Sequence, residues 1–130
     1  MKKMLAMILA LMLVFTCSAM AELTFTTGGT SGTYYAYGSV LAQYITNNSD
    51  VAVTAVAGNG SAANIDLLDL GDAQLGLVQN DVANYAYNGI RFEQYEGMPV
   101  NTFTALAALY DETVQIVTCN PDLKTVEVTS

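Results

Sequence analysis

The chain has 130 residues but contains no histidine and no tryptophan, and it has only four cations, two cysteines and two prolines. The absence of histidine excludes histidine-based triads, histidine general bases and histidine metal ligands. Twelve acidic residues give a formal net charge of −8. Binding to nucleic acid requires clustered lysine and arginine, so this class of partner is excluded. Since no nucleophile–base pair is evident, we expect a protein that is not an enzyme and uses no cofactor or metal.

The N-terminal segment has the pattern of an export signal. Two lysines precede an apolar run from Met4 to Phe15, which is too short to span the ~30 Å of a bilayer core. Small residues at Ala19 and Ala21 then form a cleavage site. Residues 1–21 are therefore expected to be a signal peptide that directs the protein to an extracytoplasmic location, the periplasm or the cell surface. A lipid anchor at Cys17 is the alternative to cleavage after Ala21.

Removal of the signal would leave 109 residues, which is enough for one small domain. Both lysines of the signal would be lost, so this part has two cations, Arg91 and Lys124, and a net charge of −10. An apolar fraction of 52% favours a folded core over disorder. Cys119 ends an apolar run and would be the only remaining thiol, and we expect it to be packed in the core.

Apolar and β-branched runs alternate with amphipathic segments along the rest of the chain. The β-prone runs predict strands over Leu23–Thr27, Val51–Val56 and Leu75–Val78. Helical spacing, with glycine or polar residues at the ends, predicts helices over Thr33–Asn47, over Ala62–Leu70, and from Asn80 or Asp81 to Asn88. Residues 90–101 predict a loop, and two further strands are predicted over Thr104–Leu109 and Thr113–Cys119.

Alternating strands and helices are typical of βαβ units, so the predicted fold class is α/β, with a mainly parallel sheet and helices on both faces. Ligands of such open sheets bind beyond the carboxyl ends of the strands. Here those ends are followed by segments rich in glycine and small polar residues, at 27–33, 58–61 and 79–81. Glycine allows close approach to the backbone, and helix N-termini present N–H groups to an anion. An acidic protein can therefore hold an anionic ligand without lysine or arginine.

The same residues also have purely structural interpretations. Helix caps are one of them, and the candidates are Thr30 or Thr33, Asn59 or Ser61, and Asn80 or Asp81. The tyrosines near the first predicted helix, Tyr34, Tyr35 and Tyr37, can be core aromatics.

The second polar segment also matches a dinucleotide-binding pattern. Gly58-x-Gly60-x-x-Ala63 follows a predicted strand and opens a helix, and Asp81 lies about twenty residues further on. An exported Rossmann-like NAD-dependent oxidoreductase fragment is therefore an alternative. The predicted export and the position after the second strand, where the pattern usually follows the first, count against it.

Four motifs occur in order along the chain: GGTSGTYY at 28–35, GNGSAAN at 58–64, LGLVQND at 75–81 and ALYDETVQ at 108–115. With this combination, residues 23–127 resemble the TAXI family of extracytoplasmic solute receptors, the substrate-binding proteins of TRAP transporters. The resemblance implies a two-lobed clamshell of the periplasmic-binding-protein type II class. It implies that the protein captures a small organic anion or amino acid, such as glutamate, glutamine or a dicarboxylate, and delivers it to TRAP membrane permease subunits.

Taken position by position, the resemblance places ligand-binding residues in the three polar segments and the fourth motif. They are Thr30, Ser31, Gly32, Thr33, Tyr34, Tyr35, Asn59, Gly60, Ser61, Gln79, Asn80, Asp81 and Tyr110.

Each group of these residues has a hypothetical role. Backbone N–H groups at Gly32–Thr33 and Gly60–Ser61 would hold a ligand carboxylate. The amides of Gln79 and Asn80 would bind polar groups of the ligand, and Asp81 would pair with an amino group. Tyr35 and Tyr110 would pack on the apolar stem of the ligand.

The length of the chain differs from that of a two-lobed receptor, which needs ~200–300 residues. We therefore expect residues 22–130 to be the first lobe of a solute-binding domain, truncated near the crossover to the second lobe. Such a fragment would bind its ligand weakly or not at all. A nonfunctional truncated remnant is a further alternative.

Overall fold

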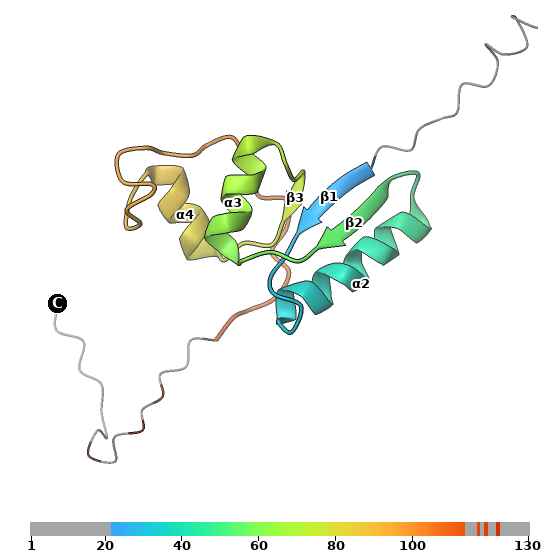
Figure 1. The fold of residues 1–130 in the computed structure, drawn as a ribbon, viewed down its shortest axis with the longest axis horizontal. Helices are drawn as coiled ribbons and strands as arrows, with labels where there is room; N and C mark the ends of the chain where they lie inside the picture. The colour runs from blue at the N-terminus through green and yellow to red at the C-terminus, as the bar shows by residue number, and fades with distance from the viewer. Residues whose placement is uncertain (1–21, 114–116, 118, 120–121, 123–130) are drawn as a thin grey trace, which may run out of the picture.

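The computed structural model describes residues 22–113 together with residues 117, 119 and 122. The predicted signal peptide, including Cys17, and most of the predicted strand over 113–119 lie outside these residues. Strands and helices alternate along the chain (Figure 1). The strands are β1 (Glu22–Thr26), β2 (Ala52–Val56) and β3 (Leu75–Gly76), and the helices are α2 (Thr33–Asn48), α3 (Ser61–Leu70) and α4 (Asn80–Asn88). These six elements confirm the first six predicted ones, although β3 is two residues shorter than expected.

The three strands form one parallel sheet in the order β2-β1-β3, with Leu23 opposite Val53 and Phe25 opposite Leu75. Successive side chains of β1 point to opposite faces of this sheet. Phe25 packs in a core cluster with Ala42 of α2, whereas the neighbouring Thr26 hydroxyl donates a hydrogen bond to Asn64 of α3. Figure 1 shows α2 on one side of the sheet and α3 with α4 on the other. The α/β class with helices on both faces is therefore confirmed.

The strand order creates a topological switch point between β1 and β3. From β1 the chain passes through α2 to β2, and from β2 it crosses through α3 to β3 on the other side of β1. The loops that leave β1 and β3 consequently lead to helices on opposite faces of the sheet. In open α/β sheets, the crevice between two such loops is the usual position of a ligand.

A second core cluster joins α3 and α4 to the loop that follows them. Ile65, Val82, Ala86 and Tyr95 are buried together. Tyr95 lies in the predicted loop over 90–101 and is only 2% exposed, and its hydroxyl donates a hydrogen bond of 3.1 Å to the carbonyl oxygen of Ala62. The loop prediction is confirmed, and a buried tyrosine attaches this loop to the domain.

Two predictions for the C-terminal part of the chain are wrong. Residues 104–109 form no strand, and Leu106 is 81% exposed. A strand needs a partner with a free edge, and β3 has only two residues paired to β1, so it gives this segment little edge to extend. Cys119 is exposed rather than buried, because both core clusters are built from residues between Leu23 and Phe103.

Across the described ranges, every helix is too short or too polar to cross a lipid bilayer.

The side chain of Asn64 connects the carboxyl ends of β1 and β3. Its amide nitrogen donates hydrogen bonds to the carbonyl oxygens of Thr27, at 2.8 Å, and Leu77, at 2.7 Å. Its amide oxygen accepts a hydrogen bond of 2.8 Å from the hydroxyl of Thr26. Asn64 and Thr26 are both fully buried. A single side chain of α3 therefore fixes the loops that leave β1 and β3, at the switch point.

We expect Asn64→Ala to lower the free energy of unfolding by about 2–4 kcal/mol, because it leaves two carbonyl oxygens and a hydroxyl buried without their partner. Urea denaturation of the purified protein measures this change. The matched control is Asn47→Ala at an exposed position of α2, which is expected to change stability by less than about 0.5 kcal/mol. Equal effects of the two substitutions would contradict this role of Asn64.

Candidate functional site

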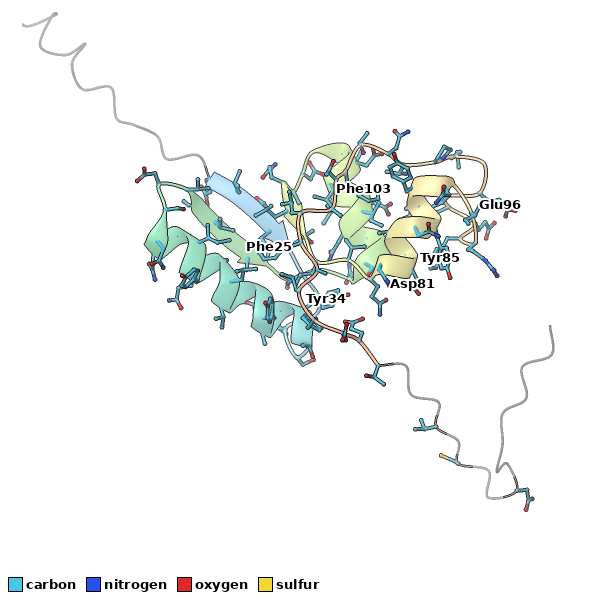
Figure 2. The ribbon with its side chains drawn as sticks, turned by 180° about the vertical axis from the view of Figure 1, so that it is seen from behind. Phe25, Tyr34, Asp81, Tyr85, Glu96 and Phe103 are labelled. Carbon is cyan, nitrogen blue, oxygen red and sulfur yellow. The ribbon has the colours of Figure 1, made fainter. Side chains whose placement is uncertain are left out.

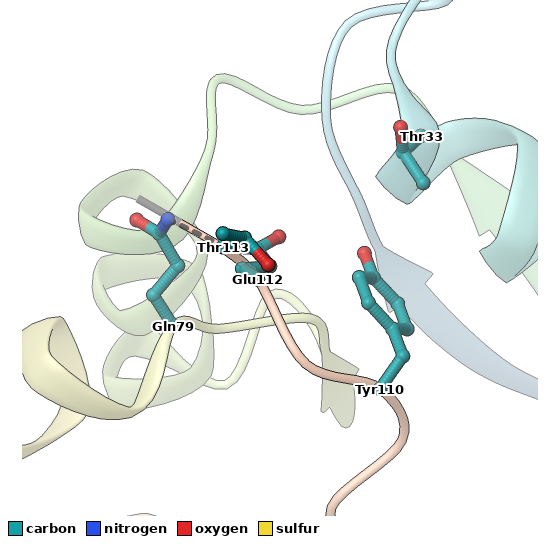
Figure 3. Close-up of a pocket in the computed structure, with 5 residues that line it drawn as sticks. All are labelled: Thr33, Gln79, Tyr110, Glu112 and Thr113. Carbon is teal, nitrogen blue, oxygen red and sulfur yellow. Dashed lines mark hydrogen bonds between the residues drawn. The ribbon is translucent and has the colours of Figure 1, made fainter. Parts of the chain in front are cut away.

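An open pocket of about 410 Å³ lies at the carboxyl edge of the sheet, between the segments that follow β1 and β3. It is lined by Thr33, Gln79, Tyr110, Glu112 and Thr113. Figure 3 shows these side chains facing a common space from three segments of the chain. Thr33 is the first residue of α2, and Gln79 precedes the first residue of α4. The pocket therefore coincides with the switch point that the strand order defines.

The three helices begin at this edge without side-chain caps, within the part of the chain that the structure describes. Their N-cap residues are Gly32, Gly60 and Gln79, and none of them makes a side-chain cap hydrogen bond. The interpretations of Thr30 or Thr33, Asn59 or Ser61, and Asn80 or Asp81 as N-caps are therefore wrong. Gly60 has a φ of 90°, which favours glycine and explains why a side-chain cap is missing there. Apart from the N–H of Val82 in α4, which donates to the Asp81 carboxylate, the first N–H groups of the helices lack intrahelical partners and carry partial positive charge.

The hydroxyl of Ser61 connects the starts of α3 and α4. It accepts a hydrogen bond of 2.9 Å from the backbone N–H of Gln79, at the start of α4. Tyr34, in the first turn of α2, lies near this hydroxyl, which lowers the pKa of the tyrosine. Ser61 itself is the first residue of α3 and is buried. One small side chain therefore holds α3 and α4 together beside the pocket.

The environment of the pocket raises the pKa of two tyrosines. Burial is the main cause of the raised pKa of Tyr34, and the charge of Glu112 raises this pKa further, while the hydrogen bond with Ser61 opposes both. The pKa of Tyr110 is also raised, first by burial and then by Glu112. The ring of Tyr110 packs against that of Tyr37, with centroids 5.3 Å apart. Both hydroxyls therefore stay protonated and neutral at physiological pH.

Glu112 is a pocket residue that the sequence analysis missed. Its carboxylate accepts a hydrogen bond of 2.6 Å from the side-chain amide of Gln79 (Figure 3). Asn64 is a second residue that the sequence analysis missed. It does not line the pocket, but its hydrogen bonds to the carbonyl oxygens of Thr27 and Leu77 hold the strand ends beside it. Both residues belong to motifs that carry the family resemblance, GNGSAAN and ALYDETVQ, and this was the available signal.

The structure brings five of the sequence-derived candidates together at or beside the pocket: Thr33, Tyr34, Ser61, Gln79 and Tyr110. Gly32 and Gly60 are adjacent to these residues as helix N-caps. Six other candidates do not line the pocket formed by the described residues: Thr30, Ser31, Tyr35, Asn59, Asn80 and Asp81. Tyr35 is half-buried and the other five are exposed.

Asp81 uses one oxygen within its own helix. Its carboxylate accepts a hydrogen bond of 2.8 Å from the N–H of Val82, in the first turn of α4. Figure 2 shows Asp81 and Tyr34 at the starts of α4 and α2, on the same side of the molecule. Asp81 therefore stabilises the start of α4 electrostatically, as an acidic residue at this position does.

A protein-family model matches residues 25–130, which is most of the chain, and it describes the NMT1-like family. The chain belongs to the NMT1-like family. This is a family of periplasmic binding proteins, which are typically extracytoplasmic and are typically not enzymes. Membership implies that the protein binds a small solute and works with a transporter.

The family match gives no support to the oxidoreductase alternative. Packing in this NMT1-like chain explains the glycine at position 58, which belongs to the pattern that suggested this alternative. A Cβ atom at Gly58 would lie 2.5 Å from the carbonyl oxygen of Thr27 and 2.8 Å from the amide oxygen of Asn64. The N–H of Gly58 donates a hydrogen bond of 3.0 Å to the carbonyl oxygen of Gly28. Gly58 therefore lets the loop after β2 lie directly against the end of β1.

We expect Gly58→Ala to destabilise the protein by about 1–3 kcal/mol, because the added methyl group must displace backbone at the end of β1. Gly29→Ala is the matched control, since a Cβ atom there meets nothing within 4 Å. Thermal unfolding of the two variants gives the comparison. A Gly58→Ala protein as stable as the Gly29→Ala protein would refute the packing argument.

The raised pKa of Tyr34 predicts a loss of stability at alkaline pH. Because the folded-state pKa lies above the unfolded value of about 10, the contribution is complete below that pH and is lost as the pH rises through the folded-state value. We expect Tyr34→Phe to flatten the decline in unfolding free energy above about pH 10. Tyr44→Phe, at an exposed position of α2, should retain the wild-type decline. Urea titrations at several pH values would show whether the two variants differ.

Proposed function

We propose that this NMT1-like protein is an extracytoplasmic solute receptor of the TAXI type, which captures a small organic anion or amino acid and delivers it to a TRAP membrane permease. In this proposal residues 1–21 are a signal peptide, and residues 22–130 form the first lobe of the solute-binding domain. The motifs at 28–35, 58–64, 75–81 and 108–115 support the TAXI assignment within the broader family.

The observation that carries the proposal is the position of the pocket at the uncapped starts of α2 and α4, with the start of α3 attached through Ser61. A ligand carboxylate placed there would accept hydrogen bonds from backbone N–H groups and interact favourably with the helix dipoles. Arg91 is the only arginine or lysine in the described ranges, and it lies beyond the far end of α4. Backbone N–H groups are therefore the main source of positive potential for an anion in this pocket.

The pocket is open to solvent on one side, and this is consistent with half of a clamshell site. Small-molecule sites usually cover ~70–90% of the ligand surface. We propose that a second lobe supplies the facing contacts and closes over the solute. The lobe described here would then bind alone with low affinity.

Titration with L-glutamate, L-glutamine and 2-oxoglutarate tests the proposal, with amide NMR spectra as the readout because they detect weak binding. We expect at least one solute to shift the amide signals in the first turns of α2, α3 and α4. Gln79→Ala should weaken this binding by about tenfold, since it removes a hydrogen-bonding side chain from the pocket.

Gln43→Ala is the matched control for this titration. Gln43 is exposed on α2, ten residues after Thr33 and so about 15 Å along the helix. Its replacement should leave the affinity unchanged. Saturating shifts confined to surfaces away from the three helix starts, or no shifts with any of the solutes, would contradict the proposed function.

A further inference from the structure

The candidate pocket contains a carboxylate and no cationic side chain among the described residues that line it. The Glu112 carboxylate is held there by the side-chain amide of Gln79, at 2.6 Å, and its charge acts on both Tyr34 and Tyr110. All of these neighbours are neutral. The negative charge of Glu112 is thus oriented by hydrogen bonding but is not neutralised within the pocket.

Such a pocket offers a ligand two electrostatically different kinds of partner. The starts of α2 and α4, at Thr33 and Gln79, favour negative charge. Glu112 repels negative charge and attracts a cation. A carboxylate has four lone-pair sites, so one amide donor leaves acceptor capacity for a ligand. In an α-amino acid the carboxylate and the ammonium group are attached to the same carbon atom, and this spacing suits a pocket with both kinds of partner.

We propose that Glu112 binds the ammonium group of the solute, so that the receptor selects α-amino acid zwitterions and rejects dicarboxylates. This inference rests on the proposed function, and it narrows the class of ligand. It also assigns to Glu112 the role that the sequence analysis gave to Asp81. Asp81 does not line this pocket, and one of its oxygens accepts a hydrogen bond from Val82.

The alternative is that Glu112 only attaches its own segment to α4 through Gln79. The hydrogen bond between them is exposed to solvent, and an exposed contact of this kind contributes little to stability. If the role of Glu112 were purely structural, replacing it would change the position of its segment, and the effect on affinity would not depend on the charge of the ligand. Comparing ligands of different charge therefore separates the two roles.

Wild-type protein is titrated with L-glutamine, N-acetyl-L-glutamine and 2-oxoglutarate, and affinities are taken from the amide NMR shifts. L-Glutamine has an ammonium group and no net charge. Acetylation removes the ammonium charge but keeps the rest of the molecule, and 2-oxoglutarate has two negative charges and no ammonium group. We expect L-glutamine to bind at least about tenfold more tightly than either of the others, the value of one charge-assisted hydrogen bond.

The same titrations on Glu112→Gln test the residue itself. This substitution keeps the size and the polar character of the side chain and removes only its charge. We expect the affinity for L-glutamine to fall by about tenfold and that for 2-oxoglutarate to rise, so that the preference for the zwitterion is lost. Asp111→Asn is the control, because it removes the same charge from an exposed neighbouring residue that does not line the pocket. It should retain the wild-type preference.

The outcomes distinguish this inference from the proposed function. If 2-oxoglutarate binds at the helix starts as tightly as L-glutamine, or if Glu112→Gln keeps the wild-type preference, the role of Glu112 is refuted while the receptor function stands. If no solute of either class binds, both are refuted. The comparison of the three ligands on wild-type protein stands even if Glu112→Gln does not fold.

Discussion

The three hydrogen bonds of the buried Asn64 side chain hold the carboxyl ends of β1 and β3 at a fixed separation. These two strands end at the topological switch point, and the loops that leave them lead to α2 and α4 on opposite faces of the sheet. The separation of the two strand ends sets the separation of the two helix starts. The geometry of the candidate site therefore depends on an amide that no ligand needs to touch.

Glycine and serine complete this arrangement where larger side chains would not fit. Gly58 lets the loop after β2 pack against the carbonyl oxygen of Thr27, and Gly38 lets α2 approach the methyl group of the same threonine. Ser61 is small enough to be buried at the start of α3 while its hydroxyl accepts a hydrogen bond from the N–H of Gln79. Close packing at the strand ends brings the N-termini of the three helices to one edge of the sheet. Their N-cap residues make no side-chain cap hydrogen bond there.

The electrostatic potential in the pocket is set at the carboxyl edge of the sheet, where the helices begin. The chain is strongly acidic, yet the helix starts provide positive potential locally, because the partial charges of backbone N–H groups do not depend on side-chain composition. Within this potential Glu112 supplies a single negative charge, held beside the start of α4 by its hydrogen bond from Gln79. Together the helix starts and Glu112 favour a ligand with separated charges over one with negative charge alone.

The sequence alone determined the α/β class, the six helices and strands between residues 22 and 88, and the three polar segments at the strand ends. Local periodicity and turn residues encode these features, and they act over a few neighbouring residues. The strand predicted over 104–109 failed because a strand depends on a partner edge, which a local pattern does not encode. The hydrogen-bond partners of Asn64 and Glu112 were also decided by tertiary structure alone. Their partners lie between 13 and 38 residues away along the chain, and only folding brings them together.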